Sequence, residues 1–420
     1  MNTIQASIIT IGDELLIGQT IDTNSAYIAQ ELNKIGVWVK YRIAVGDNYN
    51  DIWNSLDQES QRSQIVIITG GLGPTADDIT KPLLCDYFKG SLVRNQEVLA
   101  HIQHLFETIY KRPGGMLERN RKQADVPDNC NVLHNSTGTA PGMHFVKDGV
   151  HFFSLPGVPK EMKDIIQTGV IPLIEKSFDR PYILHRTSVT AGMGESMVAE
   201  KLIDFEAQLP SYISLAYLPS YGMVKLRLTA KGSDKNELTS NLDKQQALLN
   251  AILSDILVSD EDETIEITIG KTLLSIGKTI GTAESCTGGT IASLLTSVAG
   301  SSNYFKGSIV SYANEIKVDA LKVNSNTISS YGAVSSETVS EMAKGAINLL
   351  NTDYIIATSG IMGPSGGTKD KPVGTVWIAL ASKEKVETHL LNLRFDRARN
   401  ISITANSALN LMRKFINSNP

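Results

Sequence analysis

Three apolar runs near the start of the chain restrict what it can fold into. The runs cover Ala6–Ile11, Val37–Val45 and Ile65–Thr69, and two amphipathic segments, Asp22–Ile35 and Tyr49–Arg62, separate them. Strands rich in Val and Ile that alternate with helices at this spacing are typical of a parallel sheet covered by helices on both faces. The N-terminal part is therefore predicted to be an α/β domain.

Two polar loops follow the first and third of these runs, at the strand ends where parallel sheets bind ligands. Their candidate residues are glycines, hydroxyls, amides and carboxylates: Gly12, Asp13, Glu14, Asp22, Thr23 and Asn24 in the first loop, and Gly70, Gly71, Gly73, Thr75, Asp77 and Asp78 in the second. Glycine amides and a helix N-terminus hold phosphate, whereas carboxylates repel it unless a divalent cation lies between them. We therefore predict a phosphate and metal site. The alternatives are turn-forming glycines and acidic helix caps.

The stretch AESCTGG, Ala283–Gly289, offers a nucleophile beside flexible backbone. The apolar run TIASLLTSVAG follows it, so Ser285 is expected where a strand ends and a helix begins. A hydroxyl there faces the unpaired N–H groups of the helix, which suit a developing oxyanion. The alternative is a serine that only caps the helix. Cys286 is intrinsically the stronger nucleophile of the two.

A base for this serine is easier to find among the lysines than among the histidines. The C-terminal part contains one histidine, His389, inside a predicted strand and remote in sequence from any acidic partner. Lys317 follows Tyr312 by five residues at a predicted strand-to-helix junction. A lysine whose pKa is lowered by burial can accept the serine proton, directly or through the tyrosine. The alternatives are a solvated helix lysine and a packed aromatic ring.

Length, charge and cysteine content limit the possible functions. A chain of 420 residues is too long for one hydrophobic core. A formal net charge of −5 without a long basic run does not suggest a nucleic-acid-binding surface. No apolar stretch approaches the roughly 18 residues of a membrane span. Three widely separated cysteines indicate a reducing cytoplasm without disulfides.

The segment after Arg180-Pro181 reads as strand, helix, strand, strand and long helix, which predicts a small α+β domain. Its loop GMGE, Gly192–Glu195, carries no basic residue, so RNA binding is not expected. Alternating strands and helices after an acidic linker, Asp260–Glu263, predict a second α/β domain. The predicted domains are 1–176, 177–262 and 263–420.

Five motifs of the first half resemble those of the competence/damage-inducible CinA family: GDELLIGQTIDTN, TGGLGPTADDIT, ERNRKQADVP, NSTGTAPG and LPGVPKEM. The resemblance implies a three-layer N-terminal domain similar to molybdopterin-binding domains, followed by a KH-like middle domain. It also implies metal-dependent hydrolysis of ADP-ribose to AMP and ribose 5-phosphate, with Mg²⁺, Mn²⁺ or Co²⁺ held by Asp13, Glu14 and Asp78. The implied substrate contacts are Gly12, Asp22, Asn24, Gly70, Gly71, Gly73, Thr75, Asn120 and Lys122.

The C-terminal motifs resemble the nicotinamide-nucleotide amidase domain of the same family: AESCTGG, VSYANEIK, GAVSSETV, SGIMGPSGG, KPVGTVW and FDR. On this resemblance Ser285 attacks the carboxamide of nicotinamide mononucleotide (NMN), while Tyr312 and Lys317 handle the proton. The products are nicotinate mononucleotide and ammonia, and no cofactor is implied. The implied substrate contacts are Thr287, Gly288, Gly289, Ser359, Gly360, Gly363, Arg397 and Arg399, with Arg397 on the phosphate.

Two places depart from the pattern or lack an assigned role. The loop with Lys369, Asp370 and Lys371 has no assigned contact, and Phe395 stands where glycine is common in relatives. The chain is expected to form a homodimer that binds small nucleotides. Its cysteines, hydropathy and charge predict a cytoplasmic protein that binds neither a membrane nor nucleic acid. The alternative is a protein that binds a nucleotide or a pterin without turning it over and acts in competence through partners.

Overall fold

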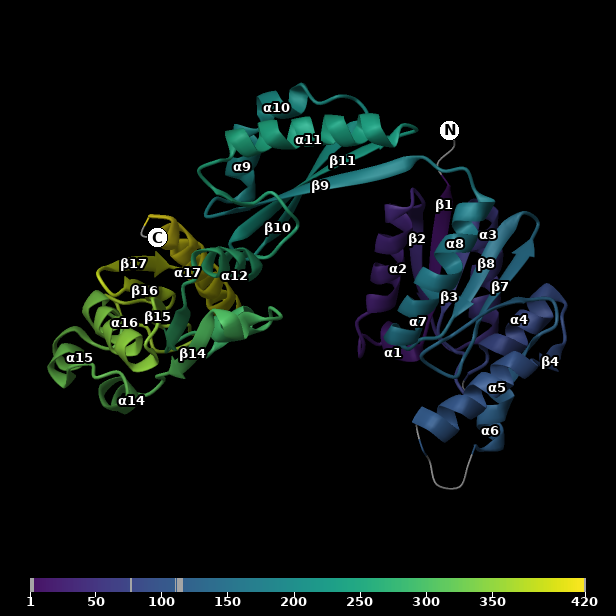
Figure 1. Cartoon of the computed structure of the whole chain (residues 1–420), viewed down its shortest axis with the longest axis horizontal. Coiled ribbons are helices and arrows are strands. Elements are labelled where there is room, and N and C mark those ends of the chain that lie inside the picture. The colour runs from purple at the N-terminus through teal and green to yellow at the C-terminus, as the bar shows by residue number, and fades with distance from the viewer. Residues whose placement is uncertain (1–3, 76–77, 110, 112–115, 419–420) are drawn as a thin grey trace. The chain divides into compact units, whose positions relative to one another are not determined.

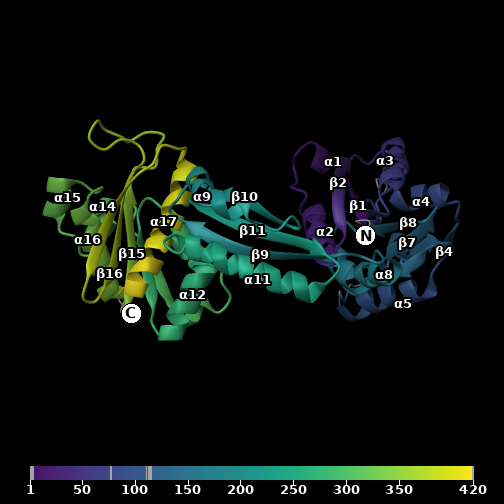
Figure 2. The same ribbon diagram turned by 90° about the horizontal axis from the view of Figure 1, so that it is seen from above.

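The computed structural model describes residues 4–75, 78–109, 111 and 116–418, and these divide into two compact units. The first unit comprises the residues up to Leu184 together with Lys231–Leu238. The second comprises His185–Ala230 and the residues from Thr239 onwards. Figures 1 and 2 label the helices and strands of both units.

The N-terminal sheet has six strands in the order β2-β1-β3-β8-β7-β6. The strands are β1 (Gln5–Ile11), β2 (Trp38–Val45), β3 (Ile65–Thr69), β6 (Asn131–Leu133), β7 (Gly142–Lys147) and β8 (Val150–Leu155). The pairs from β2 to β8 are parallel, and β7 and β6 continue the sheet antiparallel. The predicted α/β class is confirmed. Strand β2 forms the sheet edge and alternates exposed with partly buried residues.

Helices cover both faces of this sheet: α2 (Thr23–Lys34), α3 (Tyr49–Arg62), α4 (Thr80–Phe88), α7 (Pro159–Ile165), the π-helical turn η3 (Ile166–Val170) and α8 (Ile171–Ser177). The short helix α1 (Asp13–Leu16) follows β1 and has no buried residue. Ile8 and Ile67 face the core that contains α2, α7 and α8 (Figure 1). Their neighbours Ile9 and Ile68 face the core that contains α3 and α4. This alternation produces the predicted three layers.

A small layer is appended to the N-terminal sheet. It contains β4 (Leu92–Arg94), α5 (Gln96–His104), η1 (Leu105–Ile109), α6 (Glu118–Arg121), η2 (Lys122–Ala124) and β5 (Asp125–Pro127). The buried Lys81 of α4 ties this layer to the sheet, because its Nζ donates to the carbonyl oxygens of Gln123 at 2.7 Å and Asp125 at 3.3 Å.

The middle domain has a four-stranded sheet of order β10-β11-β9-β12. Its elements are β9 (Tyr182–Ala191), α9 (Glu195–Lys201), α10 (Ile203–Ala207), β10 (Ile213–Ser220), β11 (Met223–Gly232), α11 (Lys235–Ile252) and β12 (Leu257–Ser259). The predicted order of strand, helix, strand, strand and long helix is confirmed. The first predicted helix, Glu195–Phe205, is divided into α9 and α10, and the short strand β12 was not predicted.

The C-terminal sheet has the order β14-β13-β15-β16-β17. Its strands are β13 (Ile280–Glu284), β14 (Phe305–Val310), β15 (Tyr354–Gly360), β16 (Thr375–Ser382) and β17 (Val386–Asn392). The helices are α12 (Ile265–Ile276), α13 (Thr290–Thr296), η4 (Ser301–Asn303), α14 (Asn314–Asp319), α15 (Ser325–Tyr331), α16 (Ser336–Leu350) and α17 (Arg397–Ser418). Strand β13 is parallel to β14 and β15, while β16 and β17 are antiparallel additions. Residues of α12, α13 and α17 join one core and residues of α16 the other, so helices cover both faces of the sheet (Figure 2).

The middle and C-terminal domains share apolar packing. Val189, Ala191 and Val258 of the middle sheet belong to the same buried cluster as residues of α12 and α17. At the β10–β11 turn, the carbonyl oxygen of Tyr221 accepts a hydrogen bond from Asn406 Nδ2 of α17 at 2.8 Å. The middle domain is therefore packed against the C-terminal domain rather than only tethered to it.

Candidate active site

Two buried side chains meet at the carboxyl end of the central strand β13. Ser285 follows β13 directly, and Lys317 lies on α14, which follows the neighbouring parallel strand β14. Parallel strands end at the same sheet edge, and this brings the two residues together. The Lys317 Nζ donates to Ser285 Oγ at 3.1 Å, and the two residues are 1% and 8% exposed.

Lys317 is surrounded by oxygen atoms of the main chain as well. Its Nζ donates to the carbonyl oxygens of Ser311 at 2.7 Å and Tyr312 at 3.2 Å. Burial lowers the pKa of Lys317 from its ordinary value, against weaker opposing effects of nearby Cys286 and Glu315. The alternative of a solvated helix lysine is therefore wrong. Its role as the base stays a prediction.

Cys286 is poorly suited to attack a substrate. Its side chain is 5% exposed, and burial raises the pKa of its thiol to about 12. The thiolate is the reactive form of cysteine, so this thiol stays protonated at neutral pH. Of the two neighbouring nucleophiles, only Ser285 has its side chain bonded to Lys317 among the described residues.

The expected contact between Ser285 and a helix N-terminus is wrong. Helix α13 starts at Thr290, and the first N–H groups near its start donate to the carboxylate of Glu284. The distances are 2.9 Å from Gly289, 3.1 Å from Ile291 and 2.8 Å from Ala292. Glu284 is fully buried and is a functional candidate that the sequence analysis missed. An acid just before a glycine-rich turn was the available signal, because such acids cap helices.

Two backbone donors near Ser285 remain open. The N–H groups of Cys286 and Thr287 have no hydrogen-bond partner among the described residues. The Ser285 N–H itself donates to the Thr358 carbonyl oxygen at 2.9 Å. Open N–H groups beside a nucleophile are the donors that stabilise a developing oxyanion.

The Tyr312 hydroxyl points to Arg397 rather than to Ser285 or Lys317. The Tyr312 side chain is 62% exposed, and its hydroxyl accepts a hydrogen bond from Arg397 Nη2 at 3.0 Å. Arg397 opens α17, and its Nη1 donates to the Gly363 carbonyl oxygen at 3.0 Å. Only the main chain of Tyr312 touches Lys317, so the structure does not support a proton relay through the tyrosine.

Arg399 lies over two aromatic rings. Its guanidinium carbon lies 4.2 Å from the ring centroid of Phe395 and 5.4 Å from that of Tyr221. Phe395, the residue that departs from the family pattern, thus supports one face of the arginine. Tyr221 comes from the middle domain. Arg399 thus contacts aromatic rings, whereas Arg397 is held by two hydrogen bonds.

Other predicted amidase residues hold the loops around Ser285. The hydroxyls of Thr287 and Thr358 are 2.7 Å apart, and Ser359 Oγ donates to the Ala333 carbonyl oxygen at 2.6 Å. Lys371, to which the sequence assigned no contact, donates from its Nζ to the carbonyl oxygens of Tyr331 and Val334. These contacts are structural, and substrate contacts of the same residues stay predictions.

The glycines predicted for the amidase site allow turns and close approach of neighbouring backbone segments near Ser285. Gly288, Gly289 and Gly363 have φ angles of 62°, 99° and 86°, in the region that favours glycine. A Cβ atom on Gly360 would lie 2.9 Å from the Thr375 carbonyl oxygen. The backbone alone thus explains these four glycines, whatever ligand they face.

The predicted N-terminal site is a cavity of about 160 Å³ that residues of both the first loop and β3 line. Glu14, Asp22 and Asn24 line it, as do Thr69 and Gly157. Asn24 Nδ2 donates to the Gly157 carbonyl oxygen at 2.7 Å, whereas Asn24 Oδ1 is buried without a partner among the described residues. An unpaired buried acceptor at a cavity suits a ligand hydroxyl or amine.

N–H groups of the loop TGGLGPT already donate hydrogen bonds within the protein. Its N–H groups at Gly73 and Thr75 both donate to the Asp78 carboxylate at 2.8 Å, and the Gly70 N–H donates to the Leu155 carbonyl oxygen at 3.1 Å. These donors are therefore not open to a phosphate. Asp78 is used in the same contacts, and Asp77 lies outside the described residues.

The three predicted metal ligands do not gather at one point. Asp13 Oδ1 accepts the Asp47 N–H at 3.2 Å, while Asp78 bonds to its own loop. Across the described ranges, no three His, Cys, Asp or Glu side chains lie close enough to hold a metal ion. The predicted ligand set does not fit a metal, and the metal requirement stays a prediction.

Four of the predicted N-terminal residues have identifiable structural surroundings. Gly12 precedes α1, and a Cβ atom there would lie 2.4 Å from the Glu14 carboxylate. Asp22 caps α2 by accepting the Ser25 N–H at 2.9 Å, as the helix-cap alternative expects. Asn120 on α6 and Lys122 on η2 belong to the appended layer and do not line the cavity.

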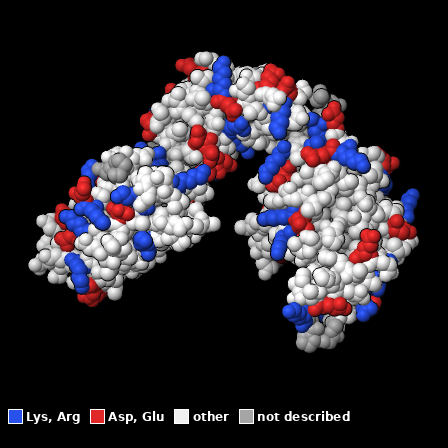
Figure 3. Space-filling model, in the orientation of Figure 1, with Lys and Arg blue, Asp and Glu red and all other residues white. Residues whose placement is uncertain are grey.

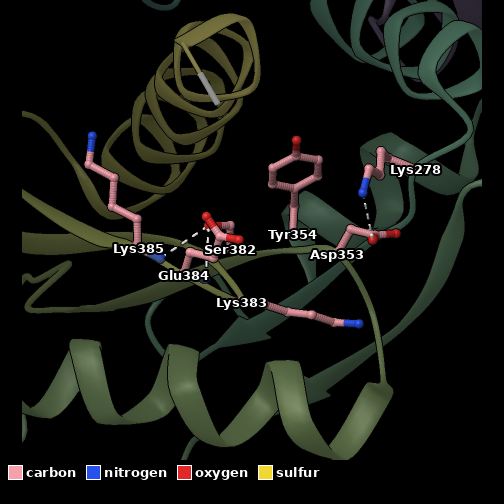
Figure 4. Close-up of a pocket in the computed structure, with 7 residues that line it drawn as sticks. All are labelled: Lys278, Asp353, Tyr354, Ser382, Lys383, Glu384 and Lys385. Atoms are coloured by element: carbon pink, nitrogen blue, oxygen red, sulfur yellow. Dashed lines mark hydrogen bonds and ion pairs between the residues drawn. The ribbon is translucent and has the colours of Figure 1, made fainter. Parts of the chain in front are cut away.

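A larger cavity, of about 480 Å³, lies at the opposite edge of the C-terminal sheet. Figure 4 shows Lys278, Lys383 and Lys385 around it with their amino groups turned in different directions. Lys278 is paired with Asp353 at 3.3 Å. Lys278 precedes β13 whereas Ser285 follows it, so this cavity is separate from the Ser285 site.

In Figure 3, Lys and Arg are interspersed with Asp and Glu on the displayed face. Within the described residues, no helix is both long and apolar enough to cross a bilayer. The expectation that nucleic acid is not a partner stays a prediction.

The fold defines a three-part α/β protein with a molybdopterin-binding-like domain, a KH-like domain and a further α/β domain. Residues 7–176 match the "Probable molybdopterin binding domain", 185–258 the "Damage-inducible protein CinA KH domain" and 262–416 the "CinA C-terminal domain". The chain belongs to the CinA family.

Relatives support this assignment over the full length. The chain is 47% identical to a CinA-like protein of Flavobacterium psychrophilum and 49% identical to one of Cytophaga hutchinsonii, and each match covers 99% of both chains. It also resembles the crystal structure of competence/damage inducible protein CihA from Agrobacterium tumefaciens. That match has 36% identity and a TM-score of 0.35, and it covers 36% of this chain and 92% of the other.

Proposed function

We propose that the C-terminal domain hydrolyses the carboxamide of NMN to nicotinate mononucleotide and ammonia. The observation that carries the proposal is the 3.1 Å contact between Lys317 Nζ and Ser285 Oγ, with both residues buried. A nucleophile in reach of a base with a lowered pKa suits acyl transfer. The identity of the substrate rests on the family resemblance.

In the proposed reaction, neutral Lys317 takes the hydroxyl proton as Ser285 Oγ bonds to the carboxamide carbon. The open N–H groups of Cys286 and Thr287 stabilise the oxyanion. Lys317 then returns the proton to the nitrogen, the C–N bond breaks, and ammonia leaves. Water attacks the ester to release nicotinate mononucleotide and regenerate Ser285. Arg397, which is exposed, is proposed to hold the substrate phosphate.

The test measures the release of ammonia and of nicotinate mononucleotide when the purified full-length chain is supplied with NMN. We expect equal amounts of both products. If neither product forms, the amidase proposal fails.

For the N-terminal domain we propose binding and hydrolysis of ADP-ribose. The supporting observation is the unpaired Asn24 Oδ1 at a cavity lined with acceptors, which suits ribose hydroxyls. Among the described residues, the absence of a cluster of metal-binding side chains favours the alternative that this domain binds a nucleotide or pterin without turnover. Homodimer formation, expected from the resemblance, is part of the proposal.

Metal removal should separate the two activities. We expect EDTA to abolish AMP release from ADP-ribose and added Mg²⁺, Mn²⁺ or Co²⁺ to restore it. Ammonia release from NMN in the same sample should not change, because the proposed amidase steps use protein groups only. AMP release that survives EDTA would contradict the metal requirement, while ADP-ribose binding without AMP would favour the non-catalytic alternative.

A further inference from the structure

The carboxylate of Glu284 ties together the turn that carries the candidate nucleophile. Glu284 directly precedes Ser285, and both of its carboxylate oxygens accept hydrogen bonds from N–H groups further along the chain. The Gly289 and Ile291 N–H groups donate to Oε2 at 2.9 and 3.1 Å, and the Ala292 N–H donates to Oε1 at 2.8 Å. One side chain thus closes a loop of the backbone that contains the nucleophile.

The turn depends on this side chain because its own backbone is flexible. Gly288 and Gly289 are consecutive glycines with φ angles of 62° and 99°. Glycine restricts its backbone less than any other residue, so the pair alone does not fix the path of the chain. The Gly288 N–H donates to the Ser285 carbonyl oxygen at 3.2 Å, which holds one end of the turn. The Glu284 carboxylate, which is fully buried, holds the other end.

The same hydrogen bonds determine which N–H groups of the turn stay open. The first N–H groups of a helix have no partner within the helix. Glu284 accepts three of those at the start of α13, and the Thr290 N–H donates to the Thr287 carbonyl oxygen at 3.0 Å. Among the described residues, the N–H groups of Cys286 and Thr287 are left without a partner. The open donors are those that directly follow the nucleophile.

We propose that Glu284 is a positioning residue of the amidase, an inference that rests on the proposed function. Its carboxylate holds the turn so that the N–H groups of Cys286 and Thr287 face the oxyanion that forms when Ser285 attacks the carboxamide carbon. Glu284 itself touches neither the substrate nor the transferred proton. Because such donors act by being in place before the charge develops, a loosened turn slows the attack more than it weakens NMN binding.

The test uses two substitutions of Glu284. Glu284→Gln keeps the size of the side chain but replaces one acceptor oxygen with an NH₂ donor, which cannot accept a backbone N–H. Glu284→Asp keeps the carboxylate but is one methylene too short to reach all three N–H groups. For both variants we expect kcat for ammonia release from NMN to fall roughly ten- to hundredfold with KM little changed. If one variant does not fold, the other decides.

A second substrate distinguishes misplaced donors from general damage to the site. The thioamide analogue of NMN also releases ammonia, but its developing charge lies on sulfur, which is a weaker hydrogen-bond acceptor than oxygen. Misplaced N–H groups should therefore slow NMN more than the thioamide. We expect the ratio of the two kcat/KM values to narrow by roughly threefold or more in both variants. Damage to Ser285 or Lys317 would slow both substrates alike.

The matched control is Asp353→Asn, at the opposite end of β13. Asp353 Oδ2 also accepts a backbone N–H, that of Thr279 at 2.9 Å, and the Thr279 hydroxyl at 2.8 Å. This substitution should lower the melting temperature and leave kcat and the substrate ratio near wild type. Wild-type kcat in the Glu284 variants, or equal slowing of both substrates, would overturn the inference and leave the amidase standing. A wild type that releases no ammonia would overturn both.

Discussion

Ser285→Ala is expected to abolish ammonia release from NMN, with a fall in kcat of roughly 10³-fold or more. The substitution removes the oxygen that Lys317 contacts at 3.1 Å and leaves no group to form the acyl-enzyme. Substrate binding should survive, because the proposed phosphate contact of Arg397 is untouched. Ammonia release measures the first effect, and calorimetric titration with NMN measures the second.

Cys286→Ala is the matched control. Its thiol is buried, and burial raises the thiol pKa to about 12, so it should contribute no attack at neutral pH. We expect this variant to keep kcat within roughly tenfold of wild type, since only packing is lost. An active Ser285→Ala combined with an inactive Cys286→Ala would reverse the assignment of the nucleophile.

Lys317→Arg is expected to reduce kcat roughly 10³-fold while keeping a positive charge in the site. Arginine cannot give up its proton in the relevant pH range, so it cannot act as the base. Lys322→Met, which removes an exposed lysine just beyond α14, should leave kcat unchanged. Activity of Lys317→Arg near the wild-type value would exclude Lys317 as the base.

The pH profile provides a second readout of the same residue. Burial lowers the pKa of Lys317 below its ordinary value of 10.5, so the neutral amine is populated at lower pH than for a solvated lysine. For wild type, kcat/KM should rise with pH through this lowered pKa and level off above it. Lys317→Arg should show no such rise. A wild-type profile that rises only near 10.5 would contradict a lowered pKa.

The sequence was informative about which residues matter and less informative about what their atoms touch. The sequence placed Tyr312 and Lys317 at the junction between β14 and α14. Beyond that point the chain leaves the strand, so the lysine turns inward to Ser285 and the tyrosine hydroxyl outward to Arg397. No periodicity rule applies at such a junction, and only coordinates distinguish the two side chains.

The glycine and carboxylate motifs likewise predicted where the loops lie, and not what their side chains contact. Both N-terminal loops lie at the predicted sheet edge and near each other, as strand order requires. Whether a carboxylate faces a ligand or its own loop depends on local turn geometry. Asp78 illustrates this, because it satisfies the N–H groups of Gly73 and Thr75 that were expected to be free.

Sequence patterns could not predict the contacts between the middle and C-terminal domains. Tyr221 and Arg399 are separated by well over a hundred residues, and no motif links them. Glu284 differs, because it acts on N–H groups only five to eight positions ahead. Greater attention to helix capping would have identified it.

The apolar cluster shared by the middle and C-terminal domains has a consequence for cooperativity. Val189, Ala191 and Val258 lose their buried surroundings if α12 and α17 unfold, and the helices lose part of theirs if the middle sheet unfolds. The two domains should therefore melt in a single calorimetric transition, although they are distinct in sequence. The N-terminal sheet has cores of its own and is free to melt separately. The boundary of cooperative unfolding thus lies near β9, at the start of the middle domain, and not at the acidic linker.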